Sequence, residues 1–321
     1  MATKSEAIDD SKSIAGSPPS YNTIHNIQVK CRQPSVFSFL SVRQRRATAL
    51  SRIRDLVSAT YVTPSSIEPI VNAYIHDLTV AELSDLLQTP NIEGHTALYW
   101  AIVNHRREVF SAFIGFISKI SSKCSSDLRL ACMQTSDQAS FLQLNFQNTN
   151  SKDESLRRFL GCPPDEIEVH HGVELDDHQF VASFRIRMFQ KRLHATRELN
   201  YDFVARGRIW WFRFYMGSKG RWIAGYGLSS PSLPASPRPS LLLETGNGEP
   251  GRETPPKRVF KGVGIESTNT LVSEEYIGNV DGQRFVSMTW ELDDQWVTYN
   301  NPTDVDCDST LHAKLEITLK E

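Results

Sequence analysis

The spacing of the apolar residues changes once along this chain of 321 residues, near positions 148–164. Before this segment, apolar residues recur every three or four positions, which is typical of amphipathic helices. After it, they alternate in short runs rich in β-branched and aromatic residues, which is typical of strands. The sequence therefore predicts an α+β multidomain protein, with a helical domain at 35–147, a linker at 148–164 and an antiparallel β-sandwich at 165–321.

Composition limits the partners and the compartment. The net charge is -2 and both signs are spread along the chain, so we expect neither nucleic acid nor a membrane as a partner. Five scattered cysteines without a C-x-x-C spacing indicate buried thiols in a reducing compartment. We therefore predict an intracellular, cytoplasmic protein, and the basic stretch RQRR at 43–46 leaves a nuclear location open. Residues 1–34 are polar, serine-rich and interrupted by prolines, which predicts a disordered tail.

The helical half is predicted to consist of short helices packed in pairs. Pieces such as TVAELSDLL and TALYWAIVNH suffice for two or three turns, and such helices are marginal in water unless they pack on neighbours. Thr79 followed by Glu82 has the spacing of a capping box, which predicts the start of one of these helices.

Residues 91–114, NIEGHTALYWAIVNHRREVFSAFI, have the layout of a turn followed by two helices. Gly94 can adopt the positive φ of a tight turn, Thr96 can cap the next helix, and Ala101 is small where paired helices approach closely. This stretch resembles the ankyrin repeat. The residues in the register of that repeat are Asn91, Gly94, Thr96, Leu98, Ala101, Glu108, Val109, Phe113 and Ile114. Ala97, Tyr99 and His105 depart from it, where the family has proline, histidine and glycine.

A single repeat cannot bury its own apolar face, so further units are expected. Leu128 and Ala131 repeat the layout of Leu98 and Ala101 further along the chain. We predict a short stack of about two to four degenerate repeats within residues 61–146, and an irregular helical bundle is the alternative. The resemblance implies protein partners, bound at the hairpin tips and the inner helices.

The strand GRIWWFRFYMG, at 207–217, should have one core face and one outer face, because side chains alternate along a strand. The predicted core set is Trp210, Phe212 and Phe214, and the opposite set is Ile209, Trp211, Arg213 and Tyr215. An outer row of aromatic residues with a cation could grip a peptide or stack a sugar, or it could be buried beneath the helical domain.

The C-terminal half has FVASFRIRMF as an opening strand, the ending DVDCDSTLHAKLEITL, and between them Phe203, Gly207, Trp210, Phe214, Tyr215 and Gly220. On these features it resembles the MATH (TRAF C-terminal-like) β-sandwich. Met216 departs from the family, which has proline there, and any eight-stranded sandwich would satisfy the strand pattern. The resemblance implies an extended peptide bound along a sheet edge or in a shallow groove.

Motifs that suggest chemistry fail on their context. Gly246, Gly248 and Gly251 have the spacing of a dinucleotide fingerprint, but Pro255 follows where a helix would be needed, so we predict a flexible Pro/Ser/Gly-rich loop at 229–256. The neighbouring His170 and His171 would point to opposite faces of a strand. The set Asp304, Asp306 and Asp308 lacks the glycine and distal glutamate of a calcium loop. We predict no metal, no cofactor and no enzymatic activity.

The sequence thus predicts a non-enzymatic interaction or adaptor protein with protein partners. A carbohydrate-binding sandwich that uses exposed aromatic residues is the alternative, and an enzyme with a site in the mouth of the sandwich is a third reading that ranks below both. The predicted contact residues are Tyr99, His105 and Arg106 in the helical domain, and Trp211, Arg213 and Tyr215 in the sandwich.

Overall fold

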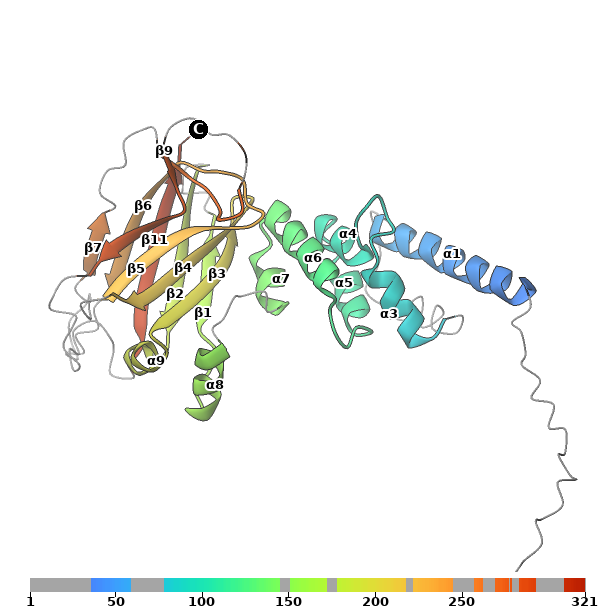
Figure 1. Cartoon of the computed structure of the whole chain (residues 1–321), viewed down its shortest axis with the longest axis horizontal. Helices are drawn as coiled ribbons and strands as arrows, with labels where there is room; N and C mark the ends of the chain where they lie inside the picture. The colour runs from blue at the N-terminus through green and yellow to red at the C-terminus, as the bar shows by residue number, and fades with distance from the viewer. Residues whose placement is uncertain are drawn as a thin grey trace, which may run out of the picture. The chain divides into compact units, whose positions relative to one another are not determined.

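The computed structural model describes residues 36–58, 78–144, 151–171, 178–217, 222–244, 257–261, 269–276, 278, 283–292 and 309–320. Within these ranges the chain has the mixed α+β composition that the sequence predicts (Figure 1). Helices come first, and antiparallel sheets dominate the second half. Several predictions lie outside the described residues: the tail at 1–34, the first part of the repeat stretch at 61–77, Gly220, the glycine-rich stretch at 246–251, and the aspartates at 304–308.

The N-terminal part consists of one long helix and several short ones. Their bounds are α1 (Val36–Ser58), α3 (Val80–Gln88), α4 (Ala97–Val103), α5 (Arg107–Ile114), α6 (Ser122–Thr135) and α7 (Gln138–Gln143). The predicted capping box is present at the start of α3. The Thr79 side chain accepts from the Glu82 backbone N–H, and the Glu82 carboxylate accepts from the Thr79 N–H at 2.9 Å.

The turn before α4 has the features expected from its sequence. Ile92 and His95 form a two-residue bridge through paired backbone hydrogen bonds, and Gly94 has φ of 83°. The Thr96 side chain accepts from the Tyr99 N–H and so caps α4. Leu98 and Ala101 are fully buried, as their helical spacing predicts.

Helices α4 and α6 end in the same way. The N–H of Arg106 donates to the Ala101 carbonyl at 2.7 Å, and that of Asp137 donates to the Cys132 carbonyl at 3.0 Å. The residues before them, His105 and Ser136, have φ of 56° and 53°. These are the bonds and the left-handed residue of a Schellman motif. His105 therefore adopts the conformation for which a glycine would be best suited.

Asp127 of α6 ties this helix to the turn before α4. One carboxylate oxygen lies 2.6 Å from His95 Nδ1, and the other accepts the Thr96 backbone N–H at 2.7 Å. Helix α6 consequently packs along α4, and Figure 1 shows the two side by side.

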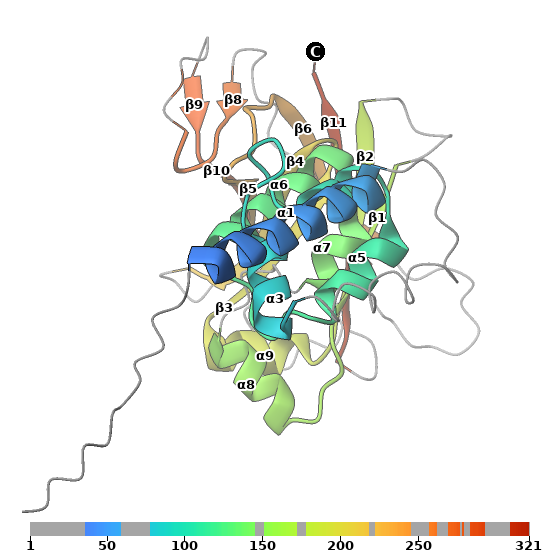
Figure 2. The same cartoon turned by 90° about the vertical axis from the view of Figure 1, so that its right-hand side faces the viewer.

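The described residues of the second half of the chain form three sheets. The strand bounds are β1 (Glu166–His170), β2 (Gln179–Ile186), β3 (Glu198–Ala205), β4 (Arg208–Met216), β5 (Trp222–Ser229), β6 (Pro237–Glu244), β7 (Lys257–Lys261), β8 (Asn269–Leu271), β9 (Gln283–Phe285), β10 (Ser287–Glu291) and β11 (Leu311–Leu319). A five-stranded sheet has the order β1-β2-β11-β6-β7, and a four-stranded sheet has the order β10-β5-β4-β3, with all pairs antiparallel. The short strands β8 and β9 pair in parallel, which the antiparallel prediction did not include (Figure 2).

Two helices lie where the sequence pattern predicted none. Helix α8 (Ser151–Phe159) occupies the predicted linker, and α9 (Phe189–Thr196) follows β2, so the opening strand ends at Ile186 instead of Phe189. Figure 1 shows α8 and α9 next to each other. Phe189 and Leu193 of α9 are fully buried in the same core as the sheet residues. Phe189 was therefore taken for the last residue of a strand, because it is apolar like the buried strand residues before it.

Among the described residues, the buried apolar side chains form two clusters. The first joins residues of the five-stranded and four-stranded sheets, including Trp210, Phe212 and Phe214 as predicted. The second joins residues of α1 and α3 to α7, but it also contains Val204 of β3 and Ile209 of β4. The two cores are therefore distinct yet meet at β3 and β4. There the Val204 N–H donates to Gln138 Oε1 at 2.7 Å.

The described part of the predicted flexible loop has a defined backbone. Residues 229–244 leave β5 through a turn that contains a cis peptide bond before Pro231, and they then form β6. The Ser232 hydroxyl, which is buried, accepts the Ile209 N–H at 2.8 Å. Residues 245–256 lie outside the described residues. Within the described ranges, no helix is long and apolar enough to cross a membrane.

The packing of the helices over Ile209 can be tested by comparing substitutions of Ile209 and Ile223, since both isoleucines lie on the outer face of the four-stranded sheet. Ile209 is fully buried in the helical cluster, whereas Ile223 is partly exposed. We expect Ile209→Ala to lower the free energy of unfolding by about 2–5 kcal/mol and Ile223→Ala by less than about 1 kcal/mol, measured by urea denaturation. Similar small losses for the two variants would show that the helices do not cover this part of the sheet.

Candidate functional site

A groove of about 420 Å³ lies on the outer face of the four-stranded sheet. It is lined by Thr196, Arg197, Glu198, Trp211, Arg213, Tyr215, Met216, Glu274, Val286, Ser287 and Thr289. The three residues predicted for the second contact site, Trp211, Arg213 and Tyr215, are thus brought together here. They come from one face of β4, as the period of two predicts.

Strand register arranges the groove in rows across the sheet. One row runs from Asp202 through Trp211 and Gly227 to Ser287. The next row runs from Asn200 through Arg213 and Gly225 to Thr289. The third runs from Glu198 through Tyr215 and Ile223 to Glu291. Side chains of β4 therefore form one wall and those of β10 the other, with β5 between them.

Two glycines of β5 keep the floor of the groove low. A Cβ built on Gly227 would lie 2.3 Å from Trp211 Cζ2, because the indole ring lies directly over the Gly227 backbone. A Cβ built on Gly225 would lie 3.3 Å from Thr289 Cγ2 and 3.5 Å from Tyr215 Cε1. Any larger residue at position 227 would displace the tryptophan, so this glycine sets where the wall stands.

Arg213 is held in place by its neighbours in the groove. Its guanidinium carbon lies 4.3 Å from the centre of the Trp211 ring, a cation–π arrangement, and its Nε lies 4.0 Å from Glu198 Oε1. Its side chain keeps 30% of its exposure. The cation is therefore oriented by an aromatic plane and a carboxylate while it still faces the solvent.

The Tyr215 hydroxyl is neutral at physiological pH. Burial raises the pKa of Tyr215 above its usual value, the Glu198 carboxylate raises it further, and Arg213 opposes this in part. The hydroxyl can thus donate or accept a hydrogen bond at the groove wall.

The predicted contact residues of the helical part lie outside the groove, and the expectation that Tyr99 is exposed is corrected. Its ring is stacked on His95 at 3.8 Å, its hydroxyl donates to Gln134 Oε1 at 2.6 Å, and it is only 5% exposed. Tyr99 therefore stabilises the packing of α4 on α6 and offers little surface to a partner. His105 is exposed and Arg106 is partly buried in the turn between α4 and α5, and neither lines the groove.

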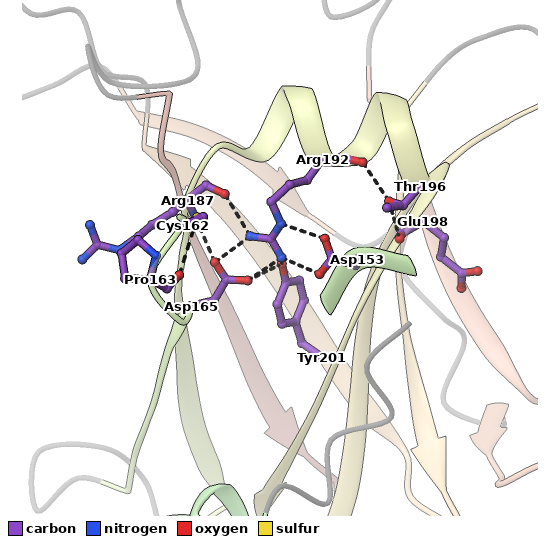
Figure 3. A network of polar contacts seen from close by, with 9 residues as sticks. All are labelled: Asp153, Cys162, Pro163, Asp165, Arg187, Arg192, Thr196, Glu198 and Tyr201. Atoms are coloured by element: carbon purple, nitrogen blue, oxygen red, sulfur yellow. Dashed lines mark hydrogen bonds and ion pairs between the residues drawn. The ribbon is translucent and has the colours of Figure 1, made fainter. Parts of the chain in front are cut away.

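A second group of ionisable side chains surrounds Arg192 of α9 (Figure 3). Its Nε and Nη2 donate to the Asp153 carboxylate at 2.8 and 2.7 Å, and its Nη1 and Nη2 donate to the Asp165 carboxylate at 2.7 Å each. Nη1 also donates to the Arg187 carbonyl at 2.9 Å. The Tyr201 hydroxyl donates to Asp165 at 3.1 Å. Arg192 is fully buried, and Asp153 and Asp165 are nearly so.

This network is saturated, which indicates a structural role. A guanidinium has five N–H groups, and Arg192 donates five hydrogen bonds of 2.7 to 2.9 Å, so every N–H has an acceptor. Burial alone would lower the pKa of Arg192, but the hydrogen bonds to Asp153 and Asp165 outweigh it and raise that pKa. Arg192 has no donor left for a ligand, so the network fastens α8 to α9 and the start of β1.

The described cysteines offer no ready nucleophile. Burial raises the pKa of the Cys124 and Cys132 thiols to about 12, and the carboxylates of Asp127 and Asp137 add to the effect. Burial also raises the pKa of Cys162, whose thiol is partly exposed. Within the described ranges, no three His, Cys, Asp or Glu side chains are grouped so that they could hold a metal ion.

Sequence reasoning found the wall of β4 but missed the rest of the groove. The glycines at positions 225 and 227, two residues apart in a predicted strand, were a usable signal, because they leave one face of that strand bare. Glu198, Ser287 and Thr289 carry no signal of their own, since their place depends on the order of the strands. The same holds for Arg192 and its two carboxylates.

No family model matches this chain, and no curated protein matches it.

The position of the Trp211 ring can be tested with paired glycine variants. We expect Gly227→Ala to lower the free energy of unfolding by about 1–3 kcal/mol, because the methyl group would overlap the indole ring. The methyl group of Gly225→Ala would lie 3.3 Å from Thr289 Cγ2 and 3.5 Å from its other neighbours, so this variant should change it by less than about 1 kcal/mol. Chemical denaturation of both variants measures the difference, and equal effects would contradict the placement of the ring over Gly227.

The structural role of the Arg192 network makes a separate prediction. Arg192→Ala leaves two buried carboxylates without their cation, so we expect a loss of about 3–5 kcal/mol in the free energy of unfolding. The control is Arg185→Ala, which removes a partly exposed ion pair with Glu166 and should cost less than about 1 kcal/mol. Both are measured by denaturant titration at pH 7, and a loss for Arg192→Ala no larger than the control would rule out the proposed role.

Proposed function

We propose that this chain is a non-enzymatic intracellular adaptor that binds an extended segment of a partner protein in the groove of the four-stranded sheet. The observation that carries the proposal is the groove itself, in which a wall of Trp211, Arg213 and Tyr215 stands beside a floor of glycines. In this proposal the helical part is a short ankyrin-like stack and the sheet part is a MATH-like β-sandwich.

The repeated ends of the helices support an ankyrin-like stack. Helices α4 and α6 both begin with a hydroxyl cap, at Thr96 and Ser121, and a left-handed residue follows each of them, His105 and Ser136. Asp127 then links the second helix to the turn before the first. Such recurrence is expected when similar units are stacked and each buries the apolar face of the next.

The sharing of one core by two antiparallel sheets supports a β-sandwich. Phe184 of β2 lies 4.8 Å from Phe212 of β4 between ring centres, so aromatic side chains of the two sheets meet. A MATH-like fold is a more specific proposal than a β-sandwich, and it rests on the sequence resemblance together with the groove.

The groove suits an extended peptide better than it suits a compact ligand. It follows the direction of β4, where the rows of Trp211 and Tyr215 are about 14 Å apart at roughly 3.4 Å per residue. Hydroxyls of Ser287, Thr289 and Tyr215 along the walls can exchange hydrogen bonds with the peptide groups of a strand. Alternate side chains of the ligand would then point into the groove.

Carbohydrate binding is the weaker alternative. A sugar needs the free face of an aromatic ring, but one face of Trp211 lies over the Gly227 backbone. The Arg213 guanidinium stacks on the same ring, and Trp211 is only 6% exposed. Tyr215 alone is more accessible, and a single ring makes a poor platform.

Selection from a library of displayed peptides tests the proposal. We expect wild-type protein to enrich a recognisable peptide motif, and Thr289→Trp, which fills the groove, to weaken binding of a selected peptide by at least about tenfold, or about 1.4 kcal/mol. The matched control is Glu168→Trp, at an exposed position of β1 in the other sheet. Fluorescence anisotropy measures the affinities.

The control variant should bind as tightly as wild type. Peptides that bind equally well to Thr289→Trp would locate binding outside the groove, and a library that yields no binder would overturn the proposal. A glycan array bound by wild type and lost on Tyr215→Ala would favour the carbohydrate alternative.

A further inference from the structure

Arg197 lines the groove from a backbone conformation that favours glycine. It is the first residue after α9, and its φ is 67°, in the left-handed region. In that region the Cβ of an L-residue lies too close to the following carbonyl oxygen, so glycine is the usual residue at such a helix end. Among the described non-glycine residues with positive φ, Arg197 is the one that lines the groove.

Hydrogen bonds on both sides hold the backbone of Arg197 in this conformation. Its N–H donates to the Leu193 carbonyl at 2.8 Å, and its own carbonyl accepts the Met216 N–H of β4 at 3.1 Å. In the last turn of α9, the Thr196 hydroxyl donates to the Arg192 carbonyl at 2.8 Å (Figure 3). The surrounding structure thus imposes a conformation that is unfavourable for an arginine, and such conformations cluster at sites that bind ligands.

The guanidinium of Arg197 has hydrogen-bonding capacity to spare. Its Nη1 lies 3.2 Å from Met216 Sδ, and a thioether sulfur is a weak acceptor. Within the part of the chain that the structure describes, the Arg197 side chain donates to no other group. The residue is exposed and none of its nitrogens is both buried and unpartnered, so the other N–H groups are open to water or to a ligand. Arg192 of the same helix differs, since it is buried and each of its N–H groups has an acceptor.

From these observations we infer that Arg197 is a specificity-determining residue of the groove, whose guanidinium donates to an oxygen of the bound segment. The chain retains an arginine where glycine would make the helix end more stable, and glycine could not supply this contact. The acceptor is a carboxylate or a peptide carbonyl of the segment, because both accept hydrogen bonds from a guanidinium. This inference rests on the proposed function, because it names a ligand contact within the same groove.

Two substitutions of Arg197 test the inference. Arg197→Gly removes both the side chain and the unfavourable conformation, so we expect the melting temperature to rise by about 1–3 °C while the affinity for a selected peptide falls at least about fivefold. Arg197→Ala removes the guanidinium alone, so it should weaken binding equally without raising the melting temperature. Scanning calorimetry and fluorescence anisotropy measure the two quantities, with the peptide that wild type enriches most strongly from the library.

Two exposed residues that do not line the groove provide matched controls. Glu93 has φ of 53°, so Glu93→Gly should raise the melting temperature as Arg197→Gly does but leave the affinity unchanged. Lys191 lies on α9, and Lys191→Ala, which also removes a cation, should leave the affinity unchanged.

The selected peptides identify the acceptor oxygen. An acidic residue that wild type enriches and Arg197→Ala does not would identify a carboxylate, whereas one motif with a lower affinity would identify a peptide carbonyl. A melting temperature that does not rise in Arg197→Gly would overturn the argument that the arginine is retained against the backbone preference. If Thr289→Trp blocks peptides that both Arg197 variants bind as tightly as wild type, the inference is wrong and the peptide groove stands. If no peptide depends on the groove, the proposed function fails as well.

Discussion

The register of β4 between β3 and β5 is the constraint on which both the core and the groove depend. Antiparallel pairing places Phe203, Trp210 and Leu228 in one row facing the core, and the next row, with Trp211, faces outwards. A slip of one residue would bury Arg213 and expose Phe212 and Phe214. Each exposed phenylalanine would forfeit about 1.5–3 kcal/mol of burial, and an unpaired buried guanidinium would cost more. One register is therefore strongly favoured, and the position of every groove residue on these strands follows from it.

The same register packs the long side chains of the groove against one another. The Trp211 ring can lie over the backbone of Gly227 because this residue has no side chain. The Arg213 guanidinium in turn stacks on the Trp211 ring. Glu198, which pairs across to Tyr215, restrains the guanidinium from the other side. Ordering of these long side chains takes place during folding, so little of that cost remains when a ligand binds.

The sequence was sufficient wherever structure depends on near neighbours. The capping box at Thr79, the turn at Gly94 and the two faces of β4 are local properties, and all three are as predicted. Helix α8 within the predicted linker was not foreseen, because the residue that holds it is remote in the sequence: Asp153 binds Arg192 in another helix. Tyr99 was taken for a contact residue because nothing in its own segment reveals Gln134 of α6. The second wall of the groove was missed for the same reason, since β10 follows β4 in the chain only after several other strands.

The helices stop where the outer face of the sheet changes character. At the row of Val204 and Ile209 the outward side chains are apolar, and the helical cluster covers them. At the next row Asp202 is still only 4% exposed, and Arg129 of α6 approaches it at 3.7 Å. Beyond it come Arg213 and Glu198, and to cover them with apolar helix surface would strip two charges of water without full hydrogen bonding. The contact between the two parts therefore ends where desolvation becomes unfavourable, and the residues that limit it are those that line the groove.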